Sequence, residues 1–349
     1  MLIKQKLESR KKLILYLDQN FLSDIEKAAS ESKDDIRLKK FEDLGKLITK
    51  LVKEEKVICP ISSYHSQESP IKFRKPILDQ AFNFSWDLHF RTELDLRLHQ
   101  IADSCVDFFG VRNLVPPSEW WEISFGVNPD LPNSSRGRGN IFIHVRRDIK
   151  LLDEIHKENK DGYLGWVTKI QERVRSEGLT FERCKKEEID SWGKATFVNP
   201  VKEIHELKIK DLPPTFNQTC GYLNALDAIS IFYRLKIACN SNKTINKFLS
   251  SNEIKDIPLA KIQGTLFAAI LTGHVDYNNK PSSQMDININ SMVLPYVDIF
   301  CTDSANKELI KQLKLDKEYN VELYSMKDID LLINRLSSLH SVTSLVGGD

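Results

Sequence analysis

The pattern of apolar and polar positions at the start of the chain predicts an α/β fold. A continuous apolar run, Leu13 to Leu17, is typical of a strand buried on both faces of a parallel sheet. A helical pattern follows from Phe21, with Asn20 as a suitable N-cap. Apolar residues then recur at helical spacing from Phe41 to Lys53, and Val57 to Cys59 reads as a second short strand.

The same alternation of strands and helices returns near the C-terminus. The expected helices are Ser283 to Leu294, Lys307 to Leu313 and Asp328 to Leu336, and the expected strands are Val297 to Cys301 and Val321 to Tyr324. Strands that alternate with helices favour a parallel sheet. The two ends of the chain are therefore expected to complete one α/β domain.

The stretch between these two ends has a different character. We expect a discontinuous α/β core formed by residues 1–68 and 281–340, a mainly helical insertion over residues 69–280, and a loose tail over residues 341–349. Helical patterns in the insertion cover Phe90 to Cys105, Tyr222 to Ile237 and Pro258 to Leu271.

Composition narrows the class of protein. The 349 residues are 41% hydrophobic and 28% charged, with a formal net charge of +1, which is ordinary for a globular protein and excludes a fibrous or wholly disordered chain. No global basic field exists to hold a polyanion, so nucleic acid would have to bind a local patch. The six cysteines form no CxxC pair, and neither a signal peptide nor a membrane span is evident. We therefore expect a cytoplasmic protein without a membrane partner.

Four acidic residues fall where open parallel sheets usually place their ligands, at the carboxyl ends of strands or at the start of adjoining helices. These residues are Asp18, Glu68, Asp286 and Asp303. Clustered carboxylates repel one another unless they bind cations or share protons. Hard oxygen ligands suit Mg²⁺ or Mn²⁺, which activate water for phosphodiester hydrolysis.

Each of these acids also has a purely structural interpretation. Asp18 and Asp303 each precede a helix and are suited to capping it. Asp286 follows Ser283 with the spacing of a capping box. Glu68 fits a surface loop, and Asp227, inside a mostly apolar helical pattern, is an alternative fourth metal ligand.

Three segments together resemble the PIN and PIN-like nucleases. They are ILYLDQNFLSDI, VICPISSYHSQES and QMDININSMVLPYVDIFCTDSANKEL. The last one looks like a bacterial branch with Pro-Tyr-x-Asp before a strand and Thr-Asp after it. The resemblance implies a three-layer α/β/α core with a central, mostly parallel sheet, and it does not extend to the insertion. By this resemblance the metal ligands are Asp18, Glu68, Asp286 and Asp303, with Asn20 and Ser304 as polar supports and Asp298 at a motif position of unassigned role.

Two further features bear on substrate contact. His65 lies three residues before Glu68 and is suited to a phosphate contact or a proton transfer, or to a structural hydrogen bond. A basic stretch follows in the insertion, where arginines suit phosphate contacts, although an exposed loop explains it equally well. Its arginines are Arg136, Arg138, Arg146 and Arg147.

The sequence therefore predicts a Mg²⁺- or Mn²⁺-dependent nuclease, with RNA favoured over DNA by analogy with PIN-like proteins. A role as a toxin or a phage-defence effector, with a protein partner or inhibitor, is compatible with this prediction. The alternative is a PIN-like module without catalysis that engages RNA or a protein through its helical insertion.

Overall fold

The computed structural model describes residues 12–30, 35–68, 74–86, 88–110, 122, 124–126, 128–130, 165, 167–193, 195, 199–213, 247–248, 251–274 and 283–341. The chain divides into two compact units. Unit 1 comprises Met1–Thr92, Trp120–Ile143 and Met292–Asp349, and unit 2 comprises Glu93–Glu119 and His144–Ser291. None of the helices in the described ranges is both long and apolar enough to cross a membrane.

Unit 1 is built on a four-stranded parallel sheet. Its strands are β1 (Leu13–Leu17), β2 (Val57–Ile58), β3 (Ile299–Cys301) and β4 (Glu322–Tyr324), in the order β2-β1-β3-β4. Leu17 pairs with Cys301, and Cys301 pairs with Tyr324, so three strands end at the same level. The predicted α/β class with a parallel sheet is confirmed, with both ends of the chain contributing strands.

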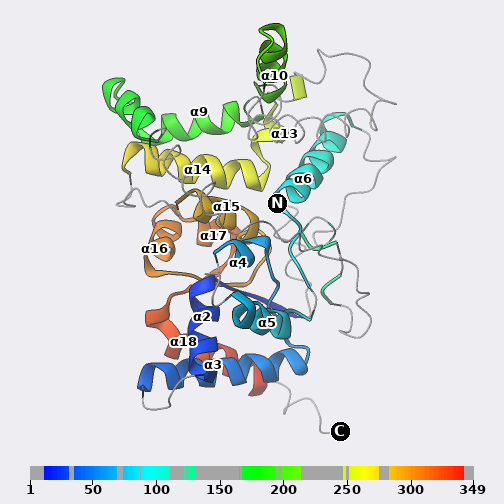
Figure 1. Ribbon diagram of the computed structural model, residues 1–349, viewed down its shortest axis with the longest axis vertical. Coiled ribbons are helices and arrows are strands. Elements are labelled where there is room, and N and C mark those ends of the chain that lie inside the picture. The colour runs from blue at the N-terminus through cyan, green and yellow to red at the C-terminus, as the bar shows by residue number, and fades with distance from the viewer. Residues whose placement is uncertain are drawn as a thin grey trace. The chain divides into compact units, whose positions relative to one another are not determined.

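Helices cover one face of this sheet through a single hydrophobic cluster. Leu15 and Leu17 of β1 belong to that cluster together with Ile299 and Cys301 of β3, all of them buried. The helices of unit 1 are α2 (Gln19–Ser30), α3 (Ile36–Lys53), α4 (Ser63–Glu68), α5 (Arg74–Ser85), α16 (Ser304–Gln312), α17 (Leu315–Tyr319) and α18 (Ile329–Ser341), with the 3-10 turn η3 (Met326–Asp328). Of these, α2, α3, α5 and α18 pack together, as Figure 1 shows.

Aromatic side chains pack on the opposite face. Tyr16 and Phe300 alternate with the residues of the first cluster along β1 and β3, and both are at most 1% exposed. The ring of Tyr16 contacts His65, Phe90 and Phe300, with centroid distances of 5.0, 5.9 and 5.5 Å. The sheet is thus buried on both faces, as expected for the apolar run of β1.

The described part of unit 2 is helical. Its elements include α6 (Glu93–Phe108), α9 (Phe181–Gly193), α10 (Asn199–Ile209), α13 (Asn252–Lys255), α14 (Pro258–Thr272) and most of α15 (Ser283–Val293). Helices α9 and α14 run side by side (Figure 1). Gly264 allows this close approach, since a Cβ there would lie 2.6 Å from Ile189. A buried hydrogen bond of 3.0 Å from Trp192 Nε1 to Gln263 Oε1 joins the same helices.

Several element boundaries differ from those expected. Helix α2 begins at Gln19, so Asn20 is its exposed second residue and not its N-cap. Asp18 takes that place, because its carbonyl oxygen accepts the backbone N–H groups of Phe21 and Leu22. Helix α16 begins at Ser304, three residues before the expected start.

Some residues of the expected insertion belong to unit 1 when the chain is divided by its contacts. Helix α5, which falls within the predicted insertion of residues 69–280, packs on α2 and α3 in unit 1. Its buried Ile77, Ala81 and Phe84 belong to the cluster on the sheet. At the other end, unit 1 resumes at Met292.

The structure gives Asp298 a role that the sequence left open. It lies just before β3, at the amino edge of the sheet, where its Oδ2 accepts the backbone N–H of Ile14 at 2.7 Å. Its own N–H donates to the Ile14 carbonyl at 2.9 Å. Asp298 therefore joins β1 to β3 at the edge opposite Asp18 and Asp303.

We expect Asp298→Ala to lower the free energy of unfolding by about 1–3 kcal/mol, since it leaves the buried N–H of Ile14 without its acceptor. Asp298→Asn keeps an acceptor oxygen and should cost less. Chemical denaturation measures both. Asp330→Ala is the control, because the exposed Asp330 forms an ion pair with Lys40 at the surface. Equal stability of Asp298→Ala and Asp330→Ala would contradict this role.

Candidate functional site

The strand order creates one topological switch point in the sheet. From β1 the chain passes first to β2 on one side and later to β3 on the other side. In open parallel sheets, ligands bind at such a point, outside the carboxyl ends of the strands. Asp18 directly follows β1, and Thr302 and Asp303 follow β3. Two of the four predicted acids therefore flank this position.

Asp18 is held at the end of β1 by backbone and side-chain hydrogen bonds. Its N–H donates to the Cys301 carbonyl at 2.9 Å, which continues the ladder between β1 and β3. Its Oδ1 accepts the N–H of Gln19 at 2.6 Å, and its Oδ2 accepts the hydroxyl of Thr302 at 3.2 Å. The side chain is partly exposed. Asp18 thus begins α2 and presents its carboxylate toward the end of β3.

Asp303 is the N-cap of α16. Its Oδ1 accepts the backbone N–H groups of Ala305 and Asn306 at 2.7 and 3.0 Å. Within the described ranges, the hydrogen bonds to this carboxylate use Oδ1 alone. A carboxylate at a helix N-terminus is also stabilised by the helix dipole. The capping role is therefore real, and it still leaves Oδ2 available to a ligand.

Two polar residues that the sequence analysis did not select connect these acids. Thr302 is 1% exposed, and its hydroxyl donates to Asp18 Oδ2. Asn306 is 2% exposed, and its Nδ2 donates to Thr302 Oγ1 at 3.0 Å. Thr302 immediately precedes the N-cap Asp303, and Asn306 is the third residue of α16, so polar residues on both sides of a predicted helix start are the signal that could have revealed the pair.

A second polar cluster lies at the end of β4. Asp328 Oδ2 accepts hydrogen bonds from Lys307 Nζ at 2.6 Å and from the Ser325 hydroxyl and N–H at 2.6 and 2.7 Å. Burial raises the pKa of Asp328, but these hydrogen bonds outweigh it and lower the pKa to about 2. The spacing Ser325-x-x-Asp328 is that of a capping box, and the structure forms one. Asp328 therefore pairs with Lys307 and caps the start of η3.

His65 is a buried structural residue in this arrangement. Its Nε2 lies 2.8 Å from the Leu17 carbonyl, and its Nδ1 accepts the N–H of Ser62 at 3.0 Å. Both contacts fit the neutral ring with its proton on Nε2. Burial lowers the pKa of His65 to about 4. The ring therefore holds the turn after β2 against the end of β1.

The remaining predicted site residues lie at the ends of helices or outside the described part of the chain. Glu68 is the last residue of α4, and its side chain lies outside the described part of the chain. Asp286, in the first turn of α15, belongs to unit 2, whereas Asp18 and Asp303 belong to unit 1. Ser304 is the first residue of α16. Asp227 and the basic stretch with Arg136, Arg138, Arg146 and Arg147 lie outside the described residues.

The oxygen donors at the ends of β1 and β3 fit a hard divalent cation. Within the ranges that the structure describes, no group of three or more His, Cys, Asp or Glu side chains gathers to enclose a metal ion. Mg²⁺ needs no such cage, because it commonly binds one or two carboxylates and keeps waters or substrate phosphates as its other ligands. Asp18 and Asp303 are of this type.

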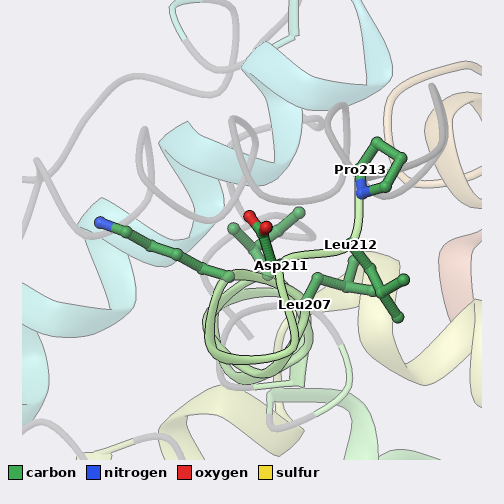
Figure 2. Close-up of a pocket in the computed structure, with 6 residues that line it drawn as sticks. Leu207, Asp211, Leu212 and Pro213 are labelled. Atoms are coloured by element: carbon green, nitrogen blue, oxygen red, sulfur yellow. The ribbon is translucent and has the colours of Figure 1, made fainter.

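A pocket in unit 2 has a different chemistry. It has a volume of about 420 Å³ and lies at the end of α10. Figure 2 shows Leu207, Asp211, Leu212 and Pro213 around it. Ile204 and Lys208 complete the lining. This surface is mostly apolar and contains none of the predicted site residues, so we place the candidate site at the ends of β1 and β3.

Comparisons with known proteins add no further assignment. No protein-family model matches the sequence, and searches of curated proteins and of solved structures found no match.

Proposed function

We propose that this protein is a metal-dependent phosphodiesterase with a PIN-like three-layer core, acting on RNA. One observation carries the proposal: Asp18 and Asp303 follow adjacent parallel strands at the switch point of the sheet, where open α/β sheets place their ligands. The resemblance to PIN-like nucleases supports the same two residues independently of the sheet order.

Each group at the ends of β1 and β3 would have a separate role in the reaction. Asp18 and Asp303 would bind the cation and orient it toward the phosphodiester. A bound Mg²⁺ or Mn²⁺ supplies an acidified water and compensates the charge that develops on the phosphate. The N-terminal end of α16 offers a positive dipole beside Asp303. Glu68 and Asp286 remain ligand predictions from the resemblance, as does the arginine stretch for substrate contact.

His65 has no place in the proton transfer of this proposal. Both of its ring nitrogens are engaged, and its lowered pKa keeps the ring neutral near pH 7. A water activated by the cation needs no histidine base. The pH dependence of cleavage should therefore not follow the titration of His65.

Cleavage assays with the full chain test the proposal. Labelled single-stranded RNA and DNA of the same sequence are incubated with Mg²⁺, with Mn²⁺ or with EDTA. We expect cleavage of RNA with either cation, weaker or no cleavage of DNA, and none with EDTA. Absence of cleavage under every condition would contradict the enzymatic proposal.

A second candidate function rests on the capping geometry. Asp303 Oδ1 accepts two N–H groups of α16, and the carbonyl of Asp18 starts α2, so both acids also have sufficient structural roles. On this basis the protein would be a PIN-like module that binds RNA or a protein without catalysis. Its distinguishing result is RNA binding that is insensitive to EDTA and not followed by cleavage.

A further inference from the structure

Hydrogen bonds of Asn306 lead toward both Asp303 and Asp18. Its backbone N–H donates to Asp303 Oδ1 at 3.0 Å. Its side-chain Nδ2 donates to Thr302 Oγ1 at 3.0 Å, and Thr302 in turn donates to Asp18 Oδ2 at 3.2 Å. Asn306 therefore lies at a branch point between the two carboxylates.

The hydrogen bond from the Asn306 side chain fixes the direction of the Thr302 hydroxyl group. A threonine hydroxyl has one hydrogen and two lone pairs. Because Asn306 Nδ2 occupies a lone pair of Thr302 Oγ1, the hydrogen of that hydroxyl is directed to Asp18 Oδ2. Both Thr302 and Asn306 are at most 2% exposed, so water does not compete freely for these bonds.

Helix stability alone does not explain an asparagine at this position. Asparagine is a weak helix former, and its burial is costly unless its amide is paired. Of the other buried positions of α16, Leu309 and Ile310 are apolar, and Lys307 is paired with Asp328. The amide of Asn306 instead donates a hydrogen bond to Thr302, whose hydroxyl donates to Asp18.

We propose that Asn306 is a positioning residue that, through Thr302, orients the Asp18 carboxylate for a divalent cation. This inference rests on the proposed function, because it assigns the cation to Asp18 and Asp303. Residues that orient metal ligands from behind commonly change metal affinity by about 10- to 100-fold when they are replaced. The hydrogen bond to Asp303 comes from the backbone N–H of Asn306, so a substitution of the Asn306 side chain keeps it.

Mn²⁺ binding to the full chain, followed by electron paramagnetic resonance of the free ion, tests the inference without an activity assay. The variants are Asn306→Leu and Thr302→Val, which keep similar side-chain volumes, and Thr302→Ser, which keeps the hydroxyl. Thr265→Val is the matched control, because Thr265 is equally buried, on α14 of unit 2. Circular dichroism in EDTA shows which variants are folded, and Thr302→Val carries the test if Asn306→Leu does not fold.

We expect Mn²⁺ affinity to fall about tenfold or more in Asn306→Leu and in Thr302→Val. Thr302→Ser and Thr265→Val should stay close to the parent protein. The double variant with Asn306→Leu and Thr302→Val should lose no more Mn²⁺ affinity than Thr302→Val alone, because both residues act on Asp18 through the same hydrogen bonds. Unchanged Mn²⁺ affinity in Thr302→Val, or additive losses of affinity in the double variant, would overturn the inference about Asn306. Mn²⁺ binding by the parent protein would still support the metal site in that case. A parent protein that binds no Mn²⁺ would overturn both.

Discussion

Replacing Asp303 by asparagine is expected to remove metal-dependent RNA cleavage while the protein remains folded. Asparagine is as good an N-cap as aspartate, so its side-chain oxygen can still accept the N–H groups of Ala305 and Asn306. The substitution removes the negative charge that a cation needs. We expect cleavage to fall by about a hundredfold or more, since loss of a ligand should exceed the loss of a supporting residue.

Comparing Asp303→Ala with Asp303→Asn separates the capping role from the catalytic role. The alanine variant loses the charge and the cap together, so its free energy of unfolding should also fall by about 1 kcal/mol. Gel assays of RNA cleavage and chemical denaturation measure the two effects on the same samples. Asp330→Asn, at an exposed position on α18, is the charge-matched control and should cleave like the parent. Full activity in Asp303→Asn would mean that Asp303 is a helix cap only.

The second large effect concerns stability in mild acid. Burial lowers the pKa of His65 from 6.5 to about 4. Between these values the unfolded chain binds a proton that the folded protein excludes, so stability is full above pH 6.5 and is lost as the pH falls toward 4. From pH 7 to pH 5 this histidine should remove about 2 kcal/mol, at a slope of up to about 1.4 kcal/mol per pH unit.

Denaturant unfolding of wild-type protein and of His65→Gln over pH 5 to 7 tests this expectation. Glutamine has a donor and an acceptor for Leu17 and Ser62 but does not titrate. The variant should start less stable at pH 7 and then lose less stability than wild type as the pH falls. His205→Gln, at an exposed position on α10, should leave the slope unchanged. Parallel slopes for wild type and His65→Gln would contradict a buried neutral histidine.

The strands were predictable from sequence because their signal is local. The run Leu13 to Leu17 is apolar at every position, and the structure buries it on both faces of the sheet. Helix starts were harder to predict. Asp18 and Asn20 are both favoured N-caps, and the choice between them depends on where β1 stops pairing with β3. Sequence alone contains no measure of that register.

The two acids at the ends of β1 and β3 were selected from sequence, but what holds them was not. Thr302 and Asn306 carry no charge, and their link to Asp18 spans most of the chain. The amino-edge bond from Ile14 to Asp298 is equally distant in sequence. Such contacts follow from the parallel pairing of strands that neither local pattern specifies.

A Mn²⁺ titration of wild-type protein and of the Asp18→Asn, Asp303→Asn double variant tests the metal-dependent site most directly. Isothermal calorimetry reports affinity and stoichiometry, and circular dichroism in EDTA shows that both proteins are folded. We expect Mn²⁺ binding by the wild-type chain and loss of that binding in the double variant. Equal Mn²⁺ binding by the two proteins, or no binding by the wild type, would contradict a metal site at the ends of β1 and β3.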